Sequence, residues 1–153
     1  MTADQLEVLR RLSARCAQKE HCLSELRKKL SATALTRAEG EEVLARLCDE
    51  GFVDEGRYAR AFASDKLRFD RWGRVKIRYA LRQKGVAEAD IDAALAGTDE
   101  EEYRSALDAF LKAKCHGAAF PPGGYAERQK LARAAISRGY EPHLVFERLR
   151  MEE

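Results

Sequence analysis

The sequence predicts an all-α protein built from three tandem three-helix repeats. Apolar residues recur with helical spacing along nearly the whole 153-residue chain, and no convincing stretch alternates as a half-buried strand does. Hydrophobic residues make up 45% of the chain and charged residues 35%, with three prolines and ten glycines, a composition typical of soluble, helix-rich proteins. A third observation, an internal repeat, groups the helices in threes.

The helical spacing divides the chain into nine expected helices. They cover residues 3–18, 20–32, 37–50, 55–70, 73–84, 88–96, 99–115, 124–138 and 141–151. Taken three at a time, these helices predict repeats at 1–53, 54–97 and 98–153. Small three-helix units of this kind stack in series, each contacting mainly its neighbour.

The second helix of each set carries the repeat. The segments ELRKKLSATAL, KIRYALRQKGV and KLARAAISRGY align with Leu26, Ile77 and Leu131 in register, at offsets of 51 and 54 residues. Ala34 occupies the position that glycine holds in the other two segments. A left-handed alanine costs about 1 kcal/mol, so we expect the first of these helices to end differently.

Two helix starts have the spacing of a capping box, in which a Ser or Thr is followed three residues later by Glu. These are Thr36 with Glu39, and Thr98 with Glu101. The acidic run 99–102 is then explained as the first turn of a helix, where negative charge complements the helix dipole.

Other boundaries follow from single residues. Asp54 can cap the helix after it, and Pro142 suits a first helical turn. Gly51, Gly85 and Gly139 stand where helices end in a left-handed residue. The segment CHGAAFPPGGY, residues 115–125, is expected to be a loop and a flexible connector, because its prolines and glycines break a helix.

The net charge of +2 conceals a strong pattern along the chain. Residues 57–84 hold ten Lys or Arg and two Asp or Glu, whereas the flanking blocks 41–56 and 85–108 are acidic. Such a distribution creates a local field that attracts polyanions or acidic protein surfaces.

The helix expected at 73–84 combines a buried face with a basic one. Ile77, Ala80 and Leu81 fall on one face and are expected in the core. The preceding helix has Tyr58 and Phe62 at helical spacing, which also indicates core positions.

Beside that core face, Arg74, Arg78 and Arg82 follow one another at four-residue steps and form a strip suited to phosphates or carboxylates, while Lys76 points to the other flank. Gly73 is expected to open the helix and leave backbone N–H groups free for an anion. The alternative is a solvated face that pairs with acidic neighbours.

We therefore predict a binding surface rather than an active site. Trp72 either stacks on a base or plugs the core at a helix junction. The candidate filament- or DNA-binding residues are Lys66, Arg68, Arg71, Trp72, Arg74, Lys76, Arg78, Arg82 and Lys84.

No catalytic residues, metal ligands or cofactor are expected. The sequence holds no phosphate-binding glycine loop, no zinc-protease motif and no nucleophile beside a base. Cys16, His21, Cys22 and Cys48 fit no usual zinc spacing. No apolar run approaches the roughly 18 residues that cross a bilayer, and no signal peptide opens the chain, so we expect a cytoplasmic protein without membrane contact.

Two linked central motifs resemble the RecX family of bacterial regulators of the RecA recombinase. They are LARLCDEGFVDEGRYARAFASDKL at 44–67 and WGRVKIRYALRQKGVAEADIDAAL at 72–95, with a weaker match in ERQKLARAAISRGYEPHLVFERL at 127–149. The resemblance implies an elongated, curved protein that lies in the helical groove of the RecA–DNA filament. It further implies a non-enzymatic monomer that acts in DNA repair, inhibits recombinase and ATPase activity and restrains homologous recombination and the SOS response. Its expected partners include single- or double-stranded DNA, bound weakly and without specificity.

Two other functions stay open at this point. Three-helix units with a basic helix also occur in helix-turn-helix DNA-binding proteins, although the basic helix offers only Gln83 for reading adenine. A purely structural helical-repeat adaptor is the other, and it predicts no salt-sensitive affinity for DNA or filament.

Overall fold

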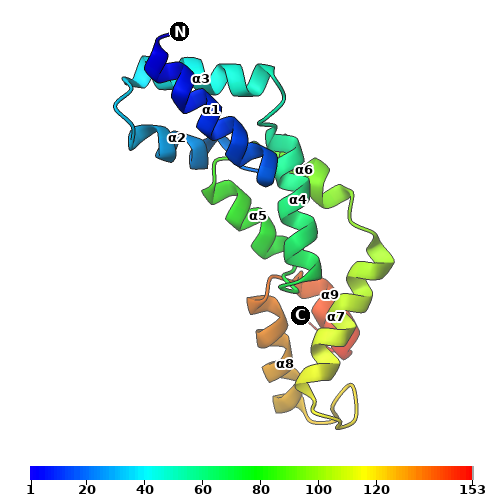
Figure 1. Cartoon of the computed structure of the whole chain (residues 1–153). Coiled ribbons are helices and arrows are strands. Elements are labelled where there is room, and N and C mark those ends of the chain that lie inside the picture. The colour runs from blue at the N-terminus through cyan, green and yellow to red at the C-terminus, as the bar shows by residue number, and fades with distance from the viewer. Residues whose placement is uncertain (153) are drawn as a thin grey trace. The chain divides into compact units, whose positions relative to one another are not determined.

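The computed structural model describes residues 1–152 and confirms the all-α fold class: this part of the chain forms nine helices and no strand (Figure 1). The helices are α1 (Ala3–Gln18), α2 (Leu23–Ser31), α3 (Arg37–Asp49), α4 (Glu55–Arg68), α5 (Arg74–Gln83), α6 (Glu88–Ala96), α7 (Glu100–Lys114), α8 (Tyr125–Ser137) and α9 (Pro142–Leu149). Each expected helix is present, and its ends lie within three residues of the expected ones.

The chain forms two compact units. The first comprises Met1–Ala61 with Leu81–Ala93, and the second comprises Phe62–Ala80 with the chain from Ala94 onward. The boundaries of the three repeats, at 1–53, 54–97 and 98–153, remain a prediction.

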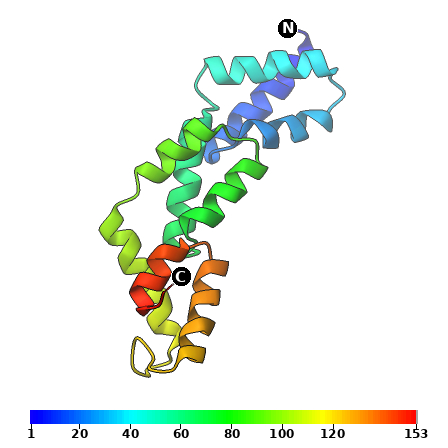
Figure 2. The ribbon, with the colours of Figure 1, turned by 180° about the vertical axis from the view of Figure 1, so that it is seen from behind.

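The core of the first unit lies among α1, α2 and α3. Both α1 and α2 contact α3 (Figures 1 and 2). Leu26, Val43 and Leu47 are completely buried there. Apolar side chains at three- and four-residue steps give each helix one buried face, and burying those faces supplies the main driving force for folding.

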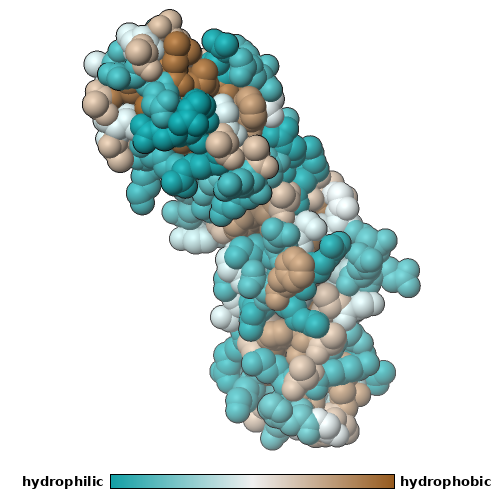
Figure 3. Space-filling model, in the orientation of Figure 1, coloured by the Kyte–Doolittle hydropathy of each residue, from teal (hydrophilic) through white to brown (hydrophobic). Residues whose placement is uncertain are grey.

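The core of the second unit lies among α7, α8 and α9. In this core α8 contacts both α7 and α9 (Figure 2). Leu111, Ala135 and Val145 are fully buried, and the rings of Tyr103 and Tyr140 lie 5.5 Å apart between their centroids. On the face drawn in Figure 3, hydrophilic residues cover most of the surface, and the hydrophobic colour is strongest near the N-terminus.

Most expected helix ends are confirmed. Thr36 and Glu39 form a complete capping box, and Asp54 accepts a hydrogen bond from the Arg57 N–H at 2.9 Å. Gly51, Gly85 and Gly139 all have positive φ angles, of 79°, 79° and 104°.

The α2 helix ends differently, as expected. Its last residue is Ser31, and the Thr33 hydroxyl donates to the Leu30 carbonyl at 2.6 Å, so Ala34 does not adopt a left-handed conformation.

Two expectations were wrong in detail. Asp99, not Thr98, caps α7, because the Asp99 carboxylate accepts the Glu102 N–H while the Thr98 N–H bonds to Leu95 in the preceding turn. The 115–125 loop is not a loose connector, since Phe120 packs against the second unit's core with the Arg148 guanidinium 4.7 Å from its ring centroid.

Candidate nucleic-acid interface

A tight turn joins α4 to α5 in the most basic part of the chain. The Phe69 N–H still bonds to Asp65 in helical fashion, at 2.8 Å, and the Trp72 N–H then returns to the Lys66 carbonyl, at 3.0 Å. Arg71 adopts a left-handed conformation, with φ of 55°, which reverses the chain. We call residues 66–76 the basic turn.

The end of α8 holds the basic turn from behind. Arg138 donates to the Asp70 carbonyl at 3.0 Å, and the Tyr140 hydroxyl donates to the Arg71 carbonyl at 3.1 Å. In return, the Gly73 N–H donates to the Arg138 carbonyl at 2.9 Å. The backbone of the turn is therefore fixed by direct hydrogen bonds.

Two glycines make this contact possible. A Cβ atom on Gly73 would lie 2.2 Å from the Gly139 carbonyl carbon, and one on Gly139 would lie 2.4 Å from the Lys76 Cβ. No side chain fits at either position, so the two backbones meet only because both residues are glycine.

The expected anion site at the start of α5 is contradicted by these contacts. The Gly73 and Val75 N–H groups donate to carbonyls at the end of α8, and the Arg74 N–H donates to the Tyr103 hydroxyl at 2.9 Å. The protein's own acceptors satisfy the donors that an anion needs.

Arg74 supports the structure and does not face a ligand. Its guanidinium binds Glu100 through two hydrogen bonds of 3.0 and 3.3 Å, and its Nε atom lies 3.0 Å from Glu141 Oε2. The same group lies 3.8 Å from the Tyr103 ring centroid, and its side chain is only 20% exposed. The guanidinium lowers the pKa of Glu100, while burial raises the pKa of Tyr103.

The expected strip of three open guanidinium groups is therefore not formed. Besides Arg74, Arg82 is bound through Nε and Nη2 to the carboxylate of Glu88 on the surface. Arg78 is half-buried and interacts within the protein. Lys84 is half-buried, and its carbonyl accepts the Ser24 hydroxyl at 2.7 Å.

Trp72 is half-buried and holds two ammonium groups. The Nζ atoms of Lys66 and Lys76 each lie 4.6 Å from its ring centroid, and Phe62 meets it edge-on at 6.3 Å. Lys66 also pairs with Asp70 at 3.1 Å. Cation–π attraction of this kind fixes the positions of flexible lysines, so Trp72 both plugs the junction and places positive charge.

The outer side of the basic turn carries free charge. Arg68 and Arg71 are exposed, and neither forms an ion pair within residues 1–152. Between them, Phe69 is 75% exposed. Of the predicted residues, the structure brings together Lys66, Arg68, Arg71, Trp72 and Lys76.

Sequence reasoning missed Arg138 and Phe69. In the repeat alignment Arg138 lies opposite Lys84, directly before the helix-ending glycine. This matching position could have indicated Arg138 as a further candidate residue. Phe69 lies inside the expected helix 55–70, but α4 ends at Arg68. Helical spacing alone does not reveal that the chain turns there and leaves Phe69 exposed.

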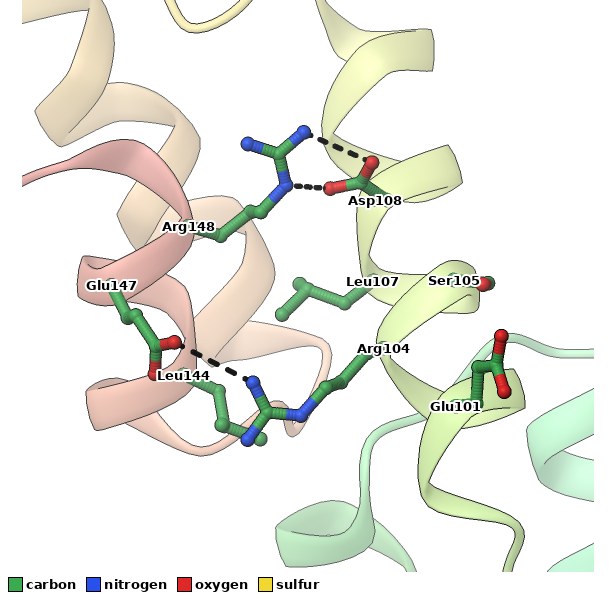
Figure 4. A pocket seen from close by; sticks show the side chains of 8 residues that line it. All are labelled: Glu101, Arg104, Ser105, Leu107, Asp108, Leu144, Glu147 and Arg148. Atoms are coloured by element: carbon green, nitrogen blue, oxygen red, sulfur yellow. Dashed lines mark hydrogen bonds and ion pairs between the residues drawn. The ribbon is translucent and has the colours of Figure 1, made fainter.

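A surface pocket lies apart from the basic turn, between α7 and α9 (Figure 4). Leu107 and Leu144 line it, and four of its five charged residues pair with one another: Arg148 with Asp108, and Arg104 with Glu147 at 3.6 Å. The Arg148 guanidinium lowers the pKa of Asp108. These pairings leave the pocket without an evident reactive group.

The described helices offer neither a metal centre nor a membrane span. Among residues 1–152 no group of His, Cys, Asp and Glu side chains is arranged to hold a metal ion. None of the helices in that range is long and apolar enough to span a bilayer. The fold and site thus define an all-α helical protein whose candidate site consists of charged and aromatic side chains.

Comparisons with known proteins identify the family. The model of the second three-helix domain of RecX matches residues 54–95. The regulatory protein RecX of Chlorobium phaeobacteroides is 30% identical over 135 residues, covering 86% of this chain and 84% of that protein. The RecX of Pseudomonas fluorescens is 34% identical over 132 residues, covering 84% and 81%. The chain belongs to the RecX family.

Solved structures agree with the fold. A crystal structure of a regulatory protein RecX superimposes with a TM-score of 0.81 at 22% identity, covering 96% of this chain and 71% of that one. RecX from Lactobacillus salivarius gives a TM-score of 0.81 at 12% identity, covering 98% and 97%.

Proposed function

We propose that this protein binds the RecA–DNA nucleoprotein filament in its helical groove and inhibits recombinase and ATPase activity. It thereby restrains homologous recombination and the SOS response, and so acts in DNA repair, as a non-enzymatic cytoplasmic monomer. Membership of the RecX family supports this function. The observation that supports the mechanism is the basic turn, whose backbone is hydrogen-bonded to the end of α8 and whose Arg68 and Arg71 form no ion pair within residues 1–152.

The basic turn suits a polyanionic partner. Because hydrogen bonds from Arg138 and Tyr140 fix its backbone, little backbone conformational entropy is lost when the charges of Arg68 and Arg71 meet phosphates or carboxylates. Exposed cations of this kind contribute mainly long-range attraction, which salt weakens.

A repeating filament multiplies weak contacts. One contact at the basic turn raises the effective concentration of every other contact along the same polymer, so an assembled filament is preferred to free recombinase subunits. Bridging several subunits would hold them in a state unfavourable for ATP turnover or strand pairing.

Co-sedimentation with recombinase filaments on single-stranded DNA tests the proposal. The variant Arg68→Gln with Arg71→Gln should bind filaments more weakly than wild type and show a flatter dependence on salt. Lys28→Gln with Arg37→Gln removes the same charge from exposed positions in the first unit and serves as the matched control.

The same assay on bare DNA separates the alternatives. Wild-type protein should prefer the filament to bare duplex of any sequence. Tight, sequence-selective binding to bare duplex would instead support a helix-turn-helix DNA-binding protein. The absence of salt-sensitive binding to both DNA and filament would support a structural adaptor.

A further inference from the structure

Phe69 is the most exposed large hydrophobic side chain of the described residues, at 75%. A single exposed apolar side chain is common on protein surfaces. Phe69 differs because the exposed arginines 68 and 71 flank it in a turn whose two carbonyls are hydrogen-bonded from behind. The backbone that carries the ring is thus fixed by hydrogen bonds within a positively charged turn.

The acidic residues close to the turn leave that charge largely intact. Asp70 is paired with Lys66 at 3.1 Å, and Asp65 is exposed on the last turns of α4. Against these, the turn carries Lys66, Arg68, Arg71 and Lys76. Four basic and two acidic residues leave the turn with net positive charge, which an anionic ligand approaching Phe69 meets.

This chemistry favours a single strand of nucleic acid over a protein. An unpaired base offers a flat face for stacking, and its phosphates remain in water beside the guanidinium groups. A protein pocket that enclosed Phe69 would also bury Arg68 and Arg71, and desolvating two cations is costly. A duplex keeps its bases stacked on one another and offers no free face.

We propose that Phe69 stacks on an unpaired nucleobase while Arg68 and Arg71 hold neighbouring phosphates. The protein would then contact the bases as well as the backbone of single-stranded DNA. The proposal rests on the proposed function for the choice of polyanion, but it requires no recombinase.

Fluorescence anisotropy of labelled oligonucleotides tests the stacking directly. At low salt, wild type should bind a thymidine oligomer of about 15 nucleotides more tightly than an abasic strand of equal length, by roughly 5- to 100-fold, as expected for base–aromatic stacking. Trp72, the single tryptophan, lies within the turn, so its fluorescence should change in the same titration. Equal affinity for the two strands would overturn the proposal, as would binding that leaves Trp72 unaffected.

Two serine variants locate the effect. Phe69→Ser should bind both strands equally, whereas Tyr125→Ser, which changes another exposed ring at 68%, should keep the wild-type preference. Phe69→Trp should retain the preference, because an indole also stacks. Circular dichroism melting shows that each variant is folded.

The outcomes also separate this proposal from the proposed function. If Phe69→Ser keeps the preference for thymidine, stacking at Phe69 is wrong even when Arg68 and Arg71 prove necessary for filament binding. If Phe69→Ser weakens only filament binding, the ring docks on protein and the proposal is equally wrong. A preserved base preference without filament inhibition would contradict the proposed function alone.

Discussion

Arg74 and Arg82 lie on the same helix, and their surroundings differ sharply. Arg74 is 20% exposed and enclosed by Glu100, Glu141 and the Tyr103 ring. Arg82 is exposed and pairs directly with Glu88 at the surface, where water screens the interaction. Charge counts along the sequence treat the two alike, because they do not show which carboxylates the fold brings near each.

Arg74→Ala should destabilise the protein. The change removes the only cation paired with Glu141 within residues 1–152 and one of the two arginines paired with Glu100, together with the contact to Tyr103, at a cost on the order of 1–3 kcal/mol. Urea denaturation followed by circular dichroism measures it, with Arg74→Lys expected to recover only part of the loss, since lysine cannot form the bidentate pair. Arg82→Ala is the control and should leave the midpoint unchanged; equal effects of the two alanine variants would contradict the structural role of Arg74.

His21 should make stability depend on pH. It is 6% exposed, and burial lowers its pKa below the ordinary 6.5 although Glu25 lies 3.9 Å from Nδ1. The unfolded chain takes up this proton more readily than the folded protein, so the free energy of unfolding should decrease as pH falls below about 6.5.

Urea midpoints between pH 7.5 and 5 check this dependence. His21→Asn should flatten the change across the window, whereas His143→Asn, at an exposed position, should not. If the urea midpoint of the wild type rose on acidification and His21→Asn abolished that rise, the predicted direction of the pH dependence would be wrong.

At the scale of the elements, the contact between α5 and the end of α8 depends on two glycines. Gly73→Ala places a Cβ 2.2 Å from the Gly139 backbone, so α5 must move. We expect a loss of about 2–3 kcal/mol, as for overpacked sites. Gly85→Ala is the matched control: its φ of 79° is left-handed but nothing lies within 4 Å, so the cost should be about 1 kcal/mol.

Thermal melting of Gly73→Ala and Gly85→Ala distinguishes the effect of close backbone approach from that of left-handed backbone strain. If Gly85→Ala proved as damaging as Gly73→Ala, the close contact would not be what fixes the start of α5.

The buried face of α5 is the element that sequence reasoning placed best. Ile77 and Leu81 are both completely buried, as their spacing predicts. Leu81→Ala should therefore cost about 2–5 kcal/mol, through lost transfer free energy and the cavity left behind. Tyr79→Ala on the same helix, 64% exposed, should have little effect on stability. A wild-type melting temperature for Leu81→Ala would contradict the orientation of the helix.

At the scale of the whole molecule, the sequence was sufficient to predict the nine helices of residues 1–152 and the all-α class, because amphipathic periodicity, caps and helix-ending glycines are local signals. The candidate site was predicted only in part. The Gly73 N–H and the Arg74 side chain were expected to be free for a ligand and are instead bonded within the protein, because their partners Tyr103, Arg138 and Glu141 lie far along the chain. Such long-range contacts leave no periodic trace in a single sequence.

The sequence located the basic region, but it did not show which of its arginines are unpaired. Composition located the basic block at 57–84, but only the structure shows that Arg68 and Arg71 lack acidic partners within residues 1–152 while Arg74 and Arg82 have them. The binding surface that we propose is therefore the basic turn and not the arginine strip expected on α5.

Recombinase ATPase activity on single-stranded DNA, titrated with this protein, tests the central claim most directly. Wild type and the Lys28→Gln, Arg37→Gln control should inhibit at amounts below one per recombinase subunit. The Arg68→Gln, Arg71→Gln variant should require roughly tenfold more protein, as expected when two phosphate or carboxylate contacts are lost. Inhibition by that variant equal to wild type, or no inhibition by the wild type, would contradict the account.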